Sequence, residues 1–408
     1  MRNVFRALTL VTTSLVFVSC SMQQDVTNPN ADVPNDGKFL AAPQGYAKVP
    51  DEYIIVFKDS KVAKSDVEGK AKGLANKHGL KLGYTYETAI RGFSAFVPPG
   101  ILKKLEDEDV IERIEEDYTI SVGPVQEYGK NTGGTTPYAR VTPEQLPWGV
   151  SAVWSTKYTS TTRPSTPAGK AWIIDTGIDP NHPDLNVDKT GLNKNFVIGG
   201  GQSASTWQDK NGHGTHVAGT IAAKADGFDV IGVAPGATVV AVRCLDSRGS
   251  GQYSWIIKGI DYVAGAANPT TDVCNMSLGG PTSTTLNTAL TNAANKGIKF
   301  ALAAGNEQSD CTNTSPAGVN GATIWTISAH TNTNTLAYFS NFGAPVDFSA
   351  PGVDVVSTRM GGGLTTMSGT SMASPHVAGI LLLGPIASRG TLIGDKDAWP
   401  DPLARVAL

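Results

Sequence analysis

The sequence contains little cysteine and few charged residues, and its N-terminal apolar run is short. Only four of the 408 residues are cysteine, and charged side chains make up 17%, below the roughly 25% of an average globular protein. The formal net charge of −3 offers no electrostatic basis for binding nucleic acid. Low charge and abundant glycine, serine and threonine, with 45 glycines, favour a loop-rich enzyme that is exported from the cell.

The N-terminus has the pattern of an export signal. Two arginines precede the apolar residues 7–18, a run too short to span a bilayer comfortably but long enough for a signal-peptide core. The run leads to Cys20 and resembles a bacterial lipoprotein signal, in which that cysteine is lipidated. Phe17 stands where the motif usually has leucine, so lipid anchoring and ordinary secretion both remain open. We expect a signal peptide at 1–20 and a polar tether at 21–49.

The cysteines beyond Cys20 do not predict a disulfide framework. Three remain, Cys244, Cys274 and Cys311, and an odd count excludes complete pairing within one chain. Cys244 and Cys274 lie in strand-like runs, where we expect them to be small buried hydrophobic residues.

Residues 50–122 have the pattern of a small α+β domain. Strands are expected at 53–57, 84–90, 92–97 and 110–115, and helices at 65–78 and 101–108. The order β-α-β-β-α-β is that of a ferredoxin-like fold. The segment holds no cluster of histidine, cysteine or paired acids with catalytic spacing, so its sequence indicates a binding module.

The pattern changes after this domain. Residues 123–146 are rich in Gly, Thr and Pro and predict an exposed linker. Within 147–408, strands are expected at 171–174, 238–242, 272–276, 298–303 and 323–328, and helices at 214–223, 253–267, 284–295 and 371–383. Continuous apolar strands between helices predict an α/β domain with a parallel sheet covered on both faces. In such a sheet the chemistry gathers at the carboxyl ends of the strands.

The stretch GTSMASPHVAG, residues 369–379, places one hydroxyl among small residues at the start of an expected helix. Free backbone N–H groups point outward at such a start. Pro375 removes the helical hydrogen bond to the carbonyl of Ser371 and loosens the first turn. Taken alone, the pattern suits either a nucleophile or a helix cap.

An acid and two histidines lie at the ends of other elements. The apolar strand WIID ends on Asp175, which is either a functional acid or an ordinary turn residue. An aspartic protease needs two such carboxylates, and the single DTG triplet would supply them only in a dimer. His213 lies between glycines in NGHGTHVAG, just before a helix, and His216 lies one turn further in. The HExxH pattern of a zinc site is absent, so we expect a structural role for His216.

Two more strands run into glycine-containing turns. The first turn holds Ser277, Leu278 and Gly279, and the second holds Ala303, Ala304, Gly305 and Asn306. Bare backbone at a sheet edge can pair with an extended peptide, and the Asn306 amide is a donor at the same edge. Both motifs also suit ordinary turns.

A parallel sheet brings Asp175, His213, Asn306 and Ser371 to one edge, and their order Asp, His, Ser is a known arrangement of a Ser-His-Asp triad. At this point the sequence resembles the subtilases, the subtilisin and proteinase K family. The matching motifs are WIIDTGI, NGHGTHVAG, NMSLGG, ALAAGN and GTSMASPHVAG. The small domain, with PDEYIIVFK at its start and VIERIEED at its end, resembles the inhibitory propeptide of the same family.

The resemblance implies a subtilisin-like three-layer domain and a serine endopeptidase that needs no cofactor for catalysis. Ser371 would be the nucleophile, His213 the general base and Asp175 its orienting partner, with Asn306 in the oxyanion hole. Residues 277–279 and 303–305 would wall a roomy pocket for apolar or aromatic side chains of polypeptide substrates. The small domain would inhibit the enzyme until self-cleavage between about Val122 and Gln145.

Further implications of the resemblance concern metal, thiols and partners. Residues 311–325 resemble a calcium-binding stretch of proteinase K-like enzymes, with Asp347 as the matching carboxylate, which implies a structural calcium ion. In the family, the strands of Cys244 and Cys274 flank the Asp175 strand on opposite sides, so these thiols should not pair. The C-terminal tail after residue 383 is shorter than in relatives. We expect no nucleic-acid partner, and membrane contact only through a lipid on Cys20.

An alternative of another class is a catalytically silent subtilase-like binding protein. Such a protein would be expected to lack one of the triad residues or Asn306, and this sequence retains all four.

Overall fold

The structure is a computed structural model that describes residues 38–40, 47–123, 126–128, 138–154, 156–198, 206–398 and 400–407. The expected signal peptide, Cys20 and most of the expected tether lie outside these residues. Among the helices described, none is both long and apolar enough to cross a membrane.

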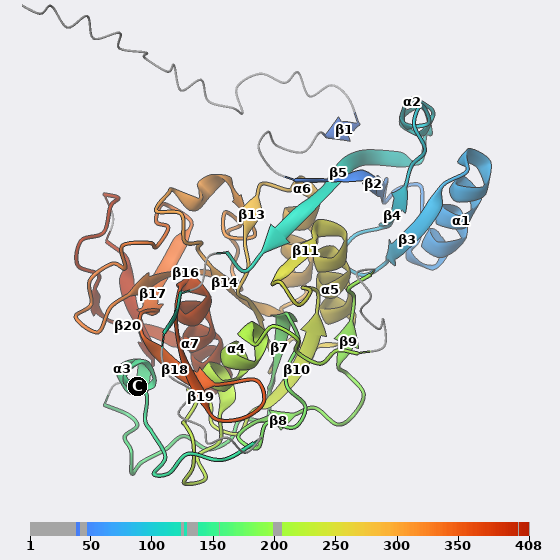
Figure 1. The fold of residues 1–408 in the computed structure, drawn as a ribbon. Coiled ribbons are helices and arrows are strands. Elements are labelled where there is room, and N and C mark those ends of the chain that lie inside the picture. Colours follow the sequence, from blue (N-terminus) through green and yellow to red (C-terminus); the bar gives the residue numbers. More distant parts are fainter. Residues whose placement is uncertain are drawn as a thin grey trace, which may run out of the picture. The chain divides into compact units, whose positions relative to one another are not determined.

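The N-terminal domain has the predicted order of elements (Figure 1). They are β2 (Lys48–Phe57), α1 (Val67–His78), β3 (Lys81–Tyr86), β4 (Gly92–Phe96), α2 (Leu102–Glu106) and β5 (Ile111–Ser121), with a 3-10 turn at Lys64–Asp66. The strands pair antiparallel in the order β5-β2-β4-β3, as in a ferredoxin-like fold. Apolar residues of α1 such as Val67 and Leu74 pack against the sheet and form this domain's core.

Several segments of this domain differ from the expectation. β5 continues to Ser121, beyond the expected end at residue 115, and β3 begins at Lys81, before the expected start at residue 84. β1 (Phe39–Leu40), inside the expected tether, pairs parallel with β5. The strand expected at 84–90 already ends at Tyr86. The reason is that the backbone N–H groups of residues 87–89 donate to Asp261 Oδ1, at 2.6–3.0 Å, and not to a neighbouring strand.

The C-terminal domain is built on a sheet with ten described strands, in the order β20-β21-β17-β16-β14-β12-β7-β10-β8, with β9 also paired to β10. The strands are β7 (Lys170–Asp175), β8 (Asn186–Val187), β9 (Lys194–Asn195), β10 (Thr238–Arg243), β12 (Val273–Met276), β14 (Lys299–Ala303), β16 (Ile324–His330), β17 (Val346–Pro351), β20 (Ile386–Thr391) and β21 (Pro402–Val406). All neighbours are parallel except β20 and β21.

Helices cover both faces of this sheet. They are α3 (Trp148–Trp154), α4 (His213–Ala222), α5 (Tyr253–Ala266), α6 (Thr284–Ala294) and α7 (Thr370–Leu383). Successive side chains of β7 point to opposite faces: Ala171 and Ile173 join the core with α4 and α7, whereas Trp172 and Ile174 join the core with α5 and α6. Figure 1 shows the two pairs of helices. The predicted three-layer α/β fold is therefore confirmed, and burial on both faces explains the continuous apolar strands.

The strand order also bears on the expectation that Cys244 and Cys274 do not form a disulfide. β7 lies between β10 and β12, so Cys244, directly after β10, and Cys274, within β12, are on opposite sides of the Asp175 strand as predicted. Both are buried and free, as is Cys311 in the 3-10 turn Cys311–Asn313.

Short strands complete the domain around its main sheet. β18 (Val355–Thr358) pairs with β19 (Leu364–Ser368), which also pairs with β6 (Gln126–Tyr128). β13 (Gly280–Pro281) pairs with β15 (Thr314–Ser315), and β11 (Ser250–Gln252) pairs with β5 of the N-terminal domain. The C-terminal tail forms the β20–β21 hairpin, and β21 lies beside β17, so the tail extends the main sheet.

Residues 138–146, expected in an exposed linker, are exposed or half-buried, but their backbone is bonded to the C-terminal domain. The N–H of Val141 donates to Asp229 Oδ1 at 2.7 Å, and the N–H of Gln145 donates to the Asp229 carbonyl at 2.8 Å. These residues therefore bind to the C-terminal domain.

Candidate active site

An acid and a histidine meet at the carboxyl edge of the sheet. Asp175 is the last residue of β7, and His213 is the first residue of α4. Both carboxylate oxygens lie 2.9 Å from His213 Nδ1, and the two residues are 0% and 2% exposed. Asp175 Oδ1 also accepts the N–H of Thr176 at 2.6 Å. A carboxylate at Nδ1 favours the tautomer with its proton there and leaves Nε2 as an acceptor.

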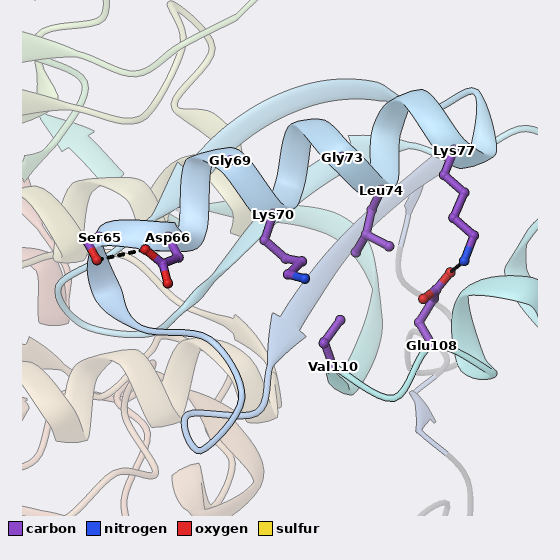
Figure 2. Close-up of a pocket in the computed structure, with 9 residues that line it drawn as sticks. All are labelled: Ser65, Asp66, Gly69, Lys70, Gly73, Leu74, Lys77, Glu108 and Val110. Atoms are coloured by element: carbon purple, nitrogen blue, oxygen red, sulfur yellow. Dashed lines mark hydrogen bonds and ion pairs between the residues drawn. The ribbon is translucent and has the colours of Figure 1, made fainter.

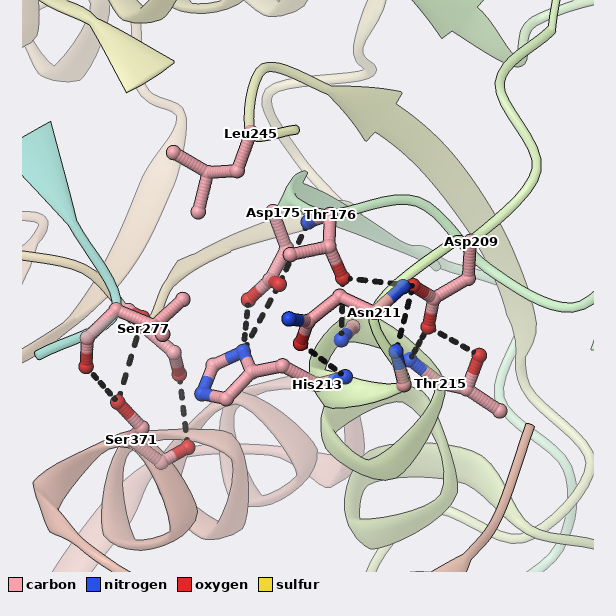
Figure 3. Close-up of polar contacts among 12 residues, drawn as sticks. Asp175, Thr176, Asp209, Asn211, His213, Thr215, Leu245, Ser277 and Ser371 are labelled. Carbon is pink, nitrogen blue, oxygen red and sulfur yellow. Dashed lines mark hydrogen bonds and ion pairs between the residues drawn. The ribbon is translucent and has the colours of Figure 1, made fainter. Parts of the chain in front are cut away.

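The other ring nitrogen of His213 is buried and has no hydrogen-bond partner among the described residues. In Figure 3 this edge of the imidazole faces Ser371. A buried, unpartnered acceptor costs free energy, and catalytic hydrogen bonds are often formed only when substrate is present. The arrangement is that of a base ready to receive a proton.

Ser371 lies in the first turn of α7, after the extended backbone of Gly369. Its Oγ is 3.3 Å from the Ser277 carbonyl and 3.4 Å from the Val122 carbonyl. Pro375 cannot donate to the Ser371 carbonyl, and Ser277 Oγ donates to that carbonyl at 2.9 Å. Ser277 Oγ thus takes the place of the N–H that Pro375 lacks. Its hydrogen bond connects the start of α7 to the residue that follows β12.

The amide of Asn306 is oriented by Thr370. Asn306 Oδ1 accepts the N–H of Thr370 at 2.8 Å and its hydroxyl at 2.9 Å. Thr370 Oγ1 in turn accepts the N–H of Gly305 at 3.1 Å. Because the amide oxygen is occupied in this way, the NH₂ group is left to face the groove, where a Cβ placed on Gly123 would be 3.5 Å from Nδ2.

A pocket of about 290 Å³ opens beside Ser371. Its lining includes the backbone-rich turns 278–280 and 303–305, together with Asn306 and the strand end Ser121–Gly123. All the residues expected to wall the pocket line it except Ser277, whose hydroxyl donates to the Ser371 carbonyl. Small residues at this wall leave space for a large side chain.

The last residues of β5 lie along this groove as an extended strand. Ser121 exchanges two backbone hydrogen bonds with Gly279, at 3.0 and 3.4 Å, and the N–H of Val122 donates to the Gly249 carbonyl at 3.1 Å. β11 pairs antiparallel on the other side of the strand. The N-terminal domain thus occupies the groove with its own backbone, in the mode of an added β-strand.

Comparison with known proteins agrees with this geometry. Residues 172–384 match the model of the subtilase family, and residues 52–122 match that of the peptidase inhibitor I9 family. The chain belongs to the subtilase family. This subtilase is 37% identical over 346 residues to subtilisin NAT of Bacillus subtilis subsp. natto, covering 83% of this chain and 81% of the relative. It is 36% identical over 349 residues to the cuticle-degrading protease of Metarhizium anisopliae, covering 84% and 81%.

The fold of the subtilase has a solved counterpart. A cold adapted subtilisin-like serine proteinase matches it with a TM-score of 0.54 and 34% identity, covering 64% of this chain and 98% of that protein. The protein is therefore a subtilisin-like serine protease that carries an I9 inhibitor domain ahead of its catalytic domain. This removes the aspartic protease alternative and disfavours the silent binding protein.

His216 lies away from the groove, as expected. It is fully buried in α4, and its Nε2 is 3.0 Å from the carbonyl of Val355. Burial lowers the pKa of His216 to about 3, so its ring is neutral near pH 7. It supports the packing of α4 against β18.

The implied calcium stretch was matched to a single carboxylate, that of Asp347. Asp347 Oδ2 accepts the N–H of Thr326 at 2.8 Å, and burial raises the pKa of Asp347 to about 6. Calcium takes six to eight oxygen ligands, and among the described residues Asp347 belongs to no group of three or more acidic, histidine or cysteine side chains that could share one ion. The only such cluster in the described residues is Asp395, Asp397 and Asp401. The calcium ion thus rests on the resemblance alone.

A second pocket, of about 590 Å³, lies on the N-terminal domain (Figure 2). It is lined by α1 and by Glu108 and Val110, and Lys77 Nζ binds Glu108 Oε1 at 2.7 Å across it. None of the residues predicted for catalysis or substrate binding borders it.

Sequence reasoning missed several residues that shape the site. Thr370 orients Asn306, β11 forms one wall of the groove, and Thr176, Asp209 and Asn211 surround the Asp175–His213 pair. The TG and DKNG residues beside Asp175 and His213 were the available indication, since polar groups buried at such a site nearly always have hydrogen-bond partners.

Proposed function

We propose that this protein is an endopeptidase that cleaves peptide bonds through an acyl-enzyme on Ser371. The observation that carries the proposal is the buried Asp175–His213 pair, whose unpartnered Nε2 faces Ser371 at the edge where the groove opens. A serine hydroxyl is too weakly acidic to attack a peptide bond unaided. A base oriented by a buried carboxylate supplies the missing activation.

The proposed steps follow from these positions. His213 Nε2 takes the Ser371 proton as Oγ attacks the scissile carbonyl, and then gives it to the leaving amine. Asp175 keeps the imidazole in the required tautomer and stabilises its charged form. The Asn306 amide and the N–H of Ser371 donate to the developing oxyanion. Water repeats the sequence to release the acid product.

Substrate choice would follow from the pocket beside Ser371. The turns 278–280 and 303–305 present glycine, alanine and backbone to a space of about 290 Å³. We therefore infer polypeptide substrates with apolar or aromatic side chains before the cut. No cofactor is needed for these steps, and a structural calcium ion near Asp347 remains part of the proposal.

The N-terminal domain would act as an intramolecular inhibitor. Its strand end Ser121–Gly123 lies in the groove with the Val122 carbonyl 3.4 Å from Ser371 Oγ, so substrate cannot enter. Self-cleavage would release it between about Val122 and Gln145. Because residues 138–146 bond to the catalytic domain, we place the cut before Tyr138.

We further propose that the protein works outside the cytoplasm. The N-terminal sequence supports export, either as a secreted enzyme or as an envelope protein held by a lipid on Cys20. Mass spectrometry of the N-terminus of the Ser371→Ala precursor, which should stay uncut when expressed in the native host, separates these two fates.

The proposed function is tested by comparing the wild type with Ser371→Ala, both made in a protease-free translation system. The wild type should give a mature fragment that begins before Tyr138 and hydrolyses apolar peptide anilides. The Ser371→Ala precursor should stay uncut. Equal processing of the two proteins would refute self-cleavage, and full activity of the uncut precursor would refute inhibition.

A further inference from the structure

The carboxylate of Asp209 accepts five hydrogen bonds although the residue is only 4% exposed. Oδ1 accepts the hydroxyl of Thr176 and the N–H groups of Asn211 and Gly212, each at 2.9 Å. Oδ2 accepts the N–H of Thr215 at 2.9 Å and its hydroxyl at 2.6 Å. Figure 3 shows these contacts converging on one side chain. None of the five donors carries a charge, so hydrogen bonds to neutral groups, and not an ion pair among these contacts, fix the position of the carboxylate.

The donors come from both sides of the Asp175–His213 pair. Thr176 directly follows Asp175 at the end of β7, whereas Asn211 and Gly212 directly precede His213. The hydroxyl of Thr176 that donates to Asp209 also accepts the N–H of Gly214 at 2.9 Å. Through Asp209, the end of β7 and the start of α4 are therefore bonded together.

Asp209 also acts in place of an N-cap side chain, which α4 lacks. The residue at the N-cap is Gly212, with φ 109°, and it has no side chain to accept hydrogen bonds. The first N–H groups of α4 instead donate to Asn211 Oδ1, Thr176 Oγ1 and Asp209 Oδ2. A negative charge at a helix N-terminus is electrostatically favourable as well.

We propose that Asp209 is a positioning residue for the reaction: it fixes the imidazole of His213 relative to Asp175 and Ser371. This inference rests on the proposed function above. Catalysis depends steeply on such distances, since a misplacement on the order of 1 Å costs about 10²-fold in rate. Asp209, Thr176 and Thr215 do not line the pocket beside Ser371, so they should not affect how tightly substrate binds.

The test compares Asp209→Asn, Thr176→Val and the double variant with the wild type. Where self-processing fails, the variant is matured with a trace of tagged wild type that is then removed. Active sites are counted by stoichiometric labelling with a fluorophosphonate, and kcat and KM are measured on an apolar peptide anilide. Asp188→Asn is the matched control: Asp188 is 5% exposed and accepts two N–H groups and a hydroxyl, from Thr190 and Leu192.

For Asp209→Asn we expect kcat per labelled site to fall about 10- to 100-fold, with KM within about twofold of the wild type. Asp188→Asn should change neither. Because Asp209 acts through Thr176, the double variant should lose much less than the product of the two single losses.

The inference is overturned if Asp209→Asn lowers only the number of labelled sites and leaves kcat per site unchanged. It is also overturned if the two single losses multiply in the double variant. Should Asp209→Asn not fold, Thr176→Val alone decides, because an unchanged kcat per site in that variant contradicts the network. A wild type that neither hydrolyses the peptide nor labels at Ser371 would instead refute the proposed function.

Discussion

Arg140 should be among the most sensitive positions for stability. Its guanidinium binds three carboxylates: Asp184 at 3.0 Å, Asp226 at 2.8 Å and Asp229 at 2.9 Å. The side chains of Asp184 and Asp229 are 0% exposed, and that of Arg140 is 23% exposed. Replacing Arg140 with methionine keeps most of the aliphatic stem but leaves buried carboxylates without their cation.

The expected decrease in the free energy of unfolding follows from this burial. Removing one partner of a buried ion pair typically costs about 3–5 kcal/mol, and the partial exposure of Arg140 argues for the lower end, about 3 kcal/mol. For a domain of this size, 1 kcal/mol lowers Tm by about 2–4 °C. We therefore expect Arg140→Met to lower Tm by roughly 6–12 °C.

The loss should also depend on pH. Burial raises the pKa of Asp184 to about 8, and Arg140 acts in the opposite direction. Removing Arg140 therefore raises this pKa further above the unfolded value of about 3.9. A group whose folded pKa is raised contributes stability at low pH that is lost as pH rises through that pKa. The gap between Arg140→Met and its parent should thus be larger at pH 9 than at pH 6.5.

The assay is thermal unfolding of the full chain in a Ser371→Ala background, which prevents autolysis. Arg248→Ala is the control, because Arg248 pairs with Asp246 but its side chain is 84% exposed, and exposed pairs contribute about 0–1 kcal/mol. If Arg140→Met unfolds within about 1 °C of Arg248→Ala at both pH values, the assigned role of Arg140 is wrong.

Three further predictions concern the active site and the thiols. Alanine at any of the three proposed triad positions should abolish most peptide hydrolysis. Combined replacements should lower the rate little more than one replacement does, because the three residues act as a unit. Retention of kcat in His213→Ala but not in His216→Ala would show that the wrong histidine is assigned. Asn306→Ala should lower kcat by ~10²–10³, the loss measured when subtilisin is deprived of its oxyanion-hole asparagine, with KM little changed in steady-state assays. Because burial raises the pKa of both Cys244 and Cys274, native protein should react slowly with iodoacetamide and unfolded protein rapidly, and a mapped disulfide between them would contradict the strand order.

Much of the fold could be predicted from the sequence because its main signals are local. Apolar strands such as Ala171–Ile174 alternate with helical segments, and buried parallel sheets require this pattern. The residues proposed as the triad could be nominated for a related reason: Asp175, His213 and Ser371 each stand at the end of an element, and the carboxyl edge of a parallel sheet collects such ends.

The rest depended on contacts between distant parts of the chain. Residues 87–90 have strand-like composition, yet the Asp261 carboxylate accepts the N–H groups of 87–89 and ends the strand. Residues 138–146 are as polar as a linker, and only the cluster of carboxylates around Arg140 shows why they bind the catalytic domain. Side chains that pair over such separations leave no periodicity in the sequence.

The central claim is that Ser371 is a nucleophile activated by His213, and labelling with a biotinylated fluorophosphonate tests it most directly. His213→Ala, which should not cleave itself, is first matured with a trace of tagged wild type that is then removed. Peptide mapping of the mature proteins by mass spectrometry should find one label per chain, on Ser371, in the wild type, and only trace labelling in His213→Ala. Absence of label from mature wild-type protein, or a label on another serine, would contradict the account.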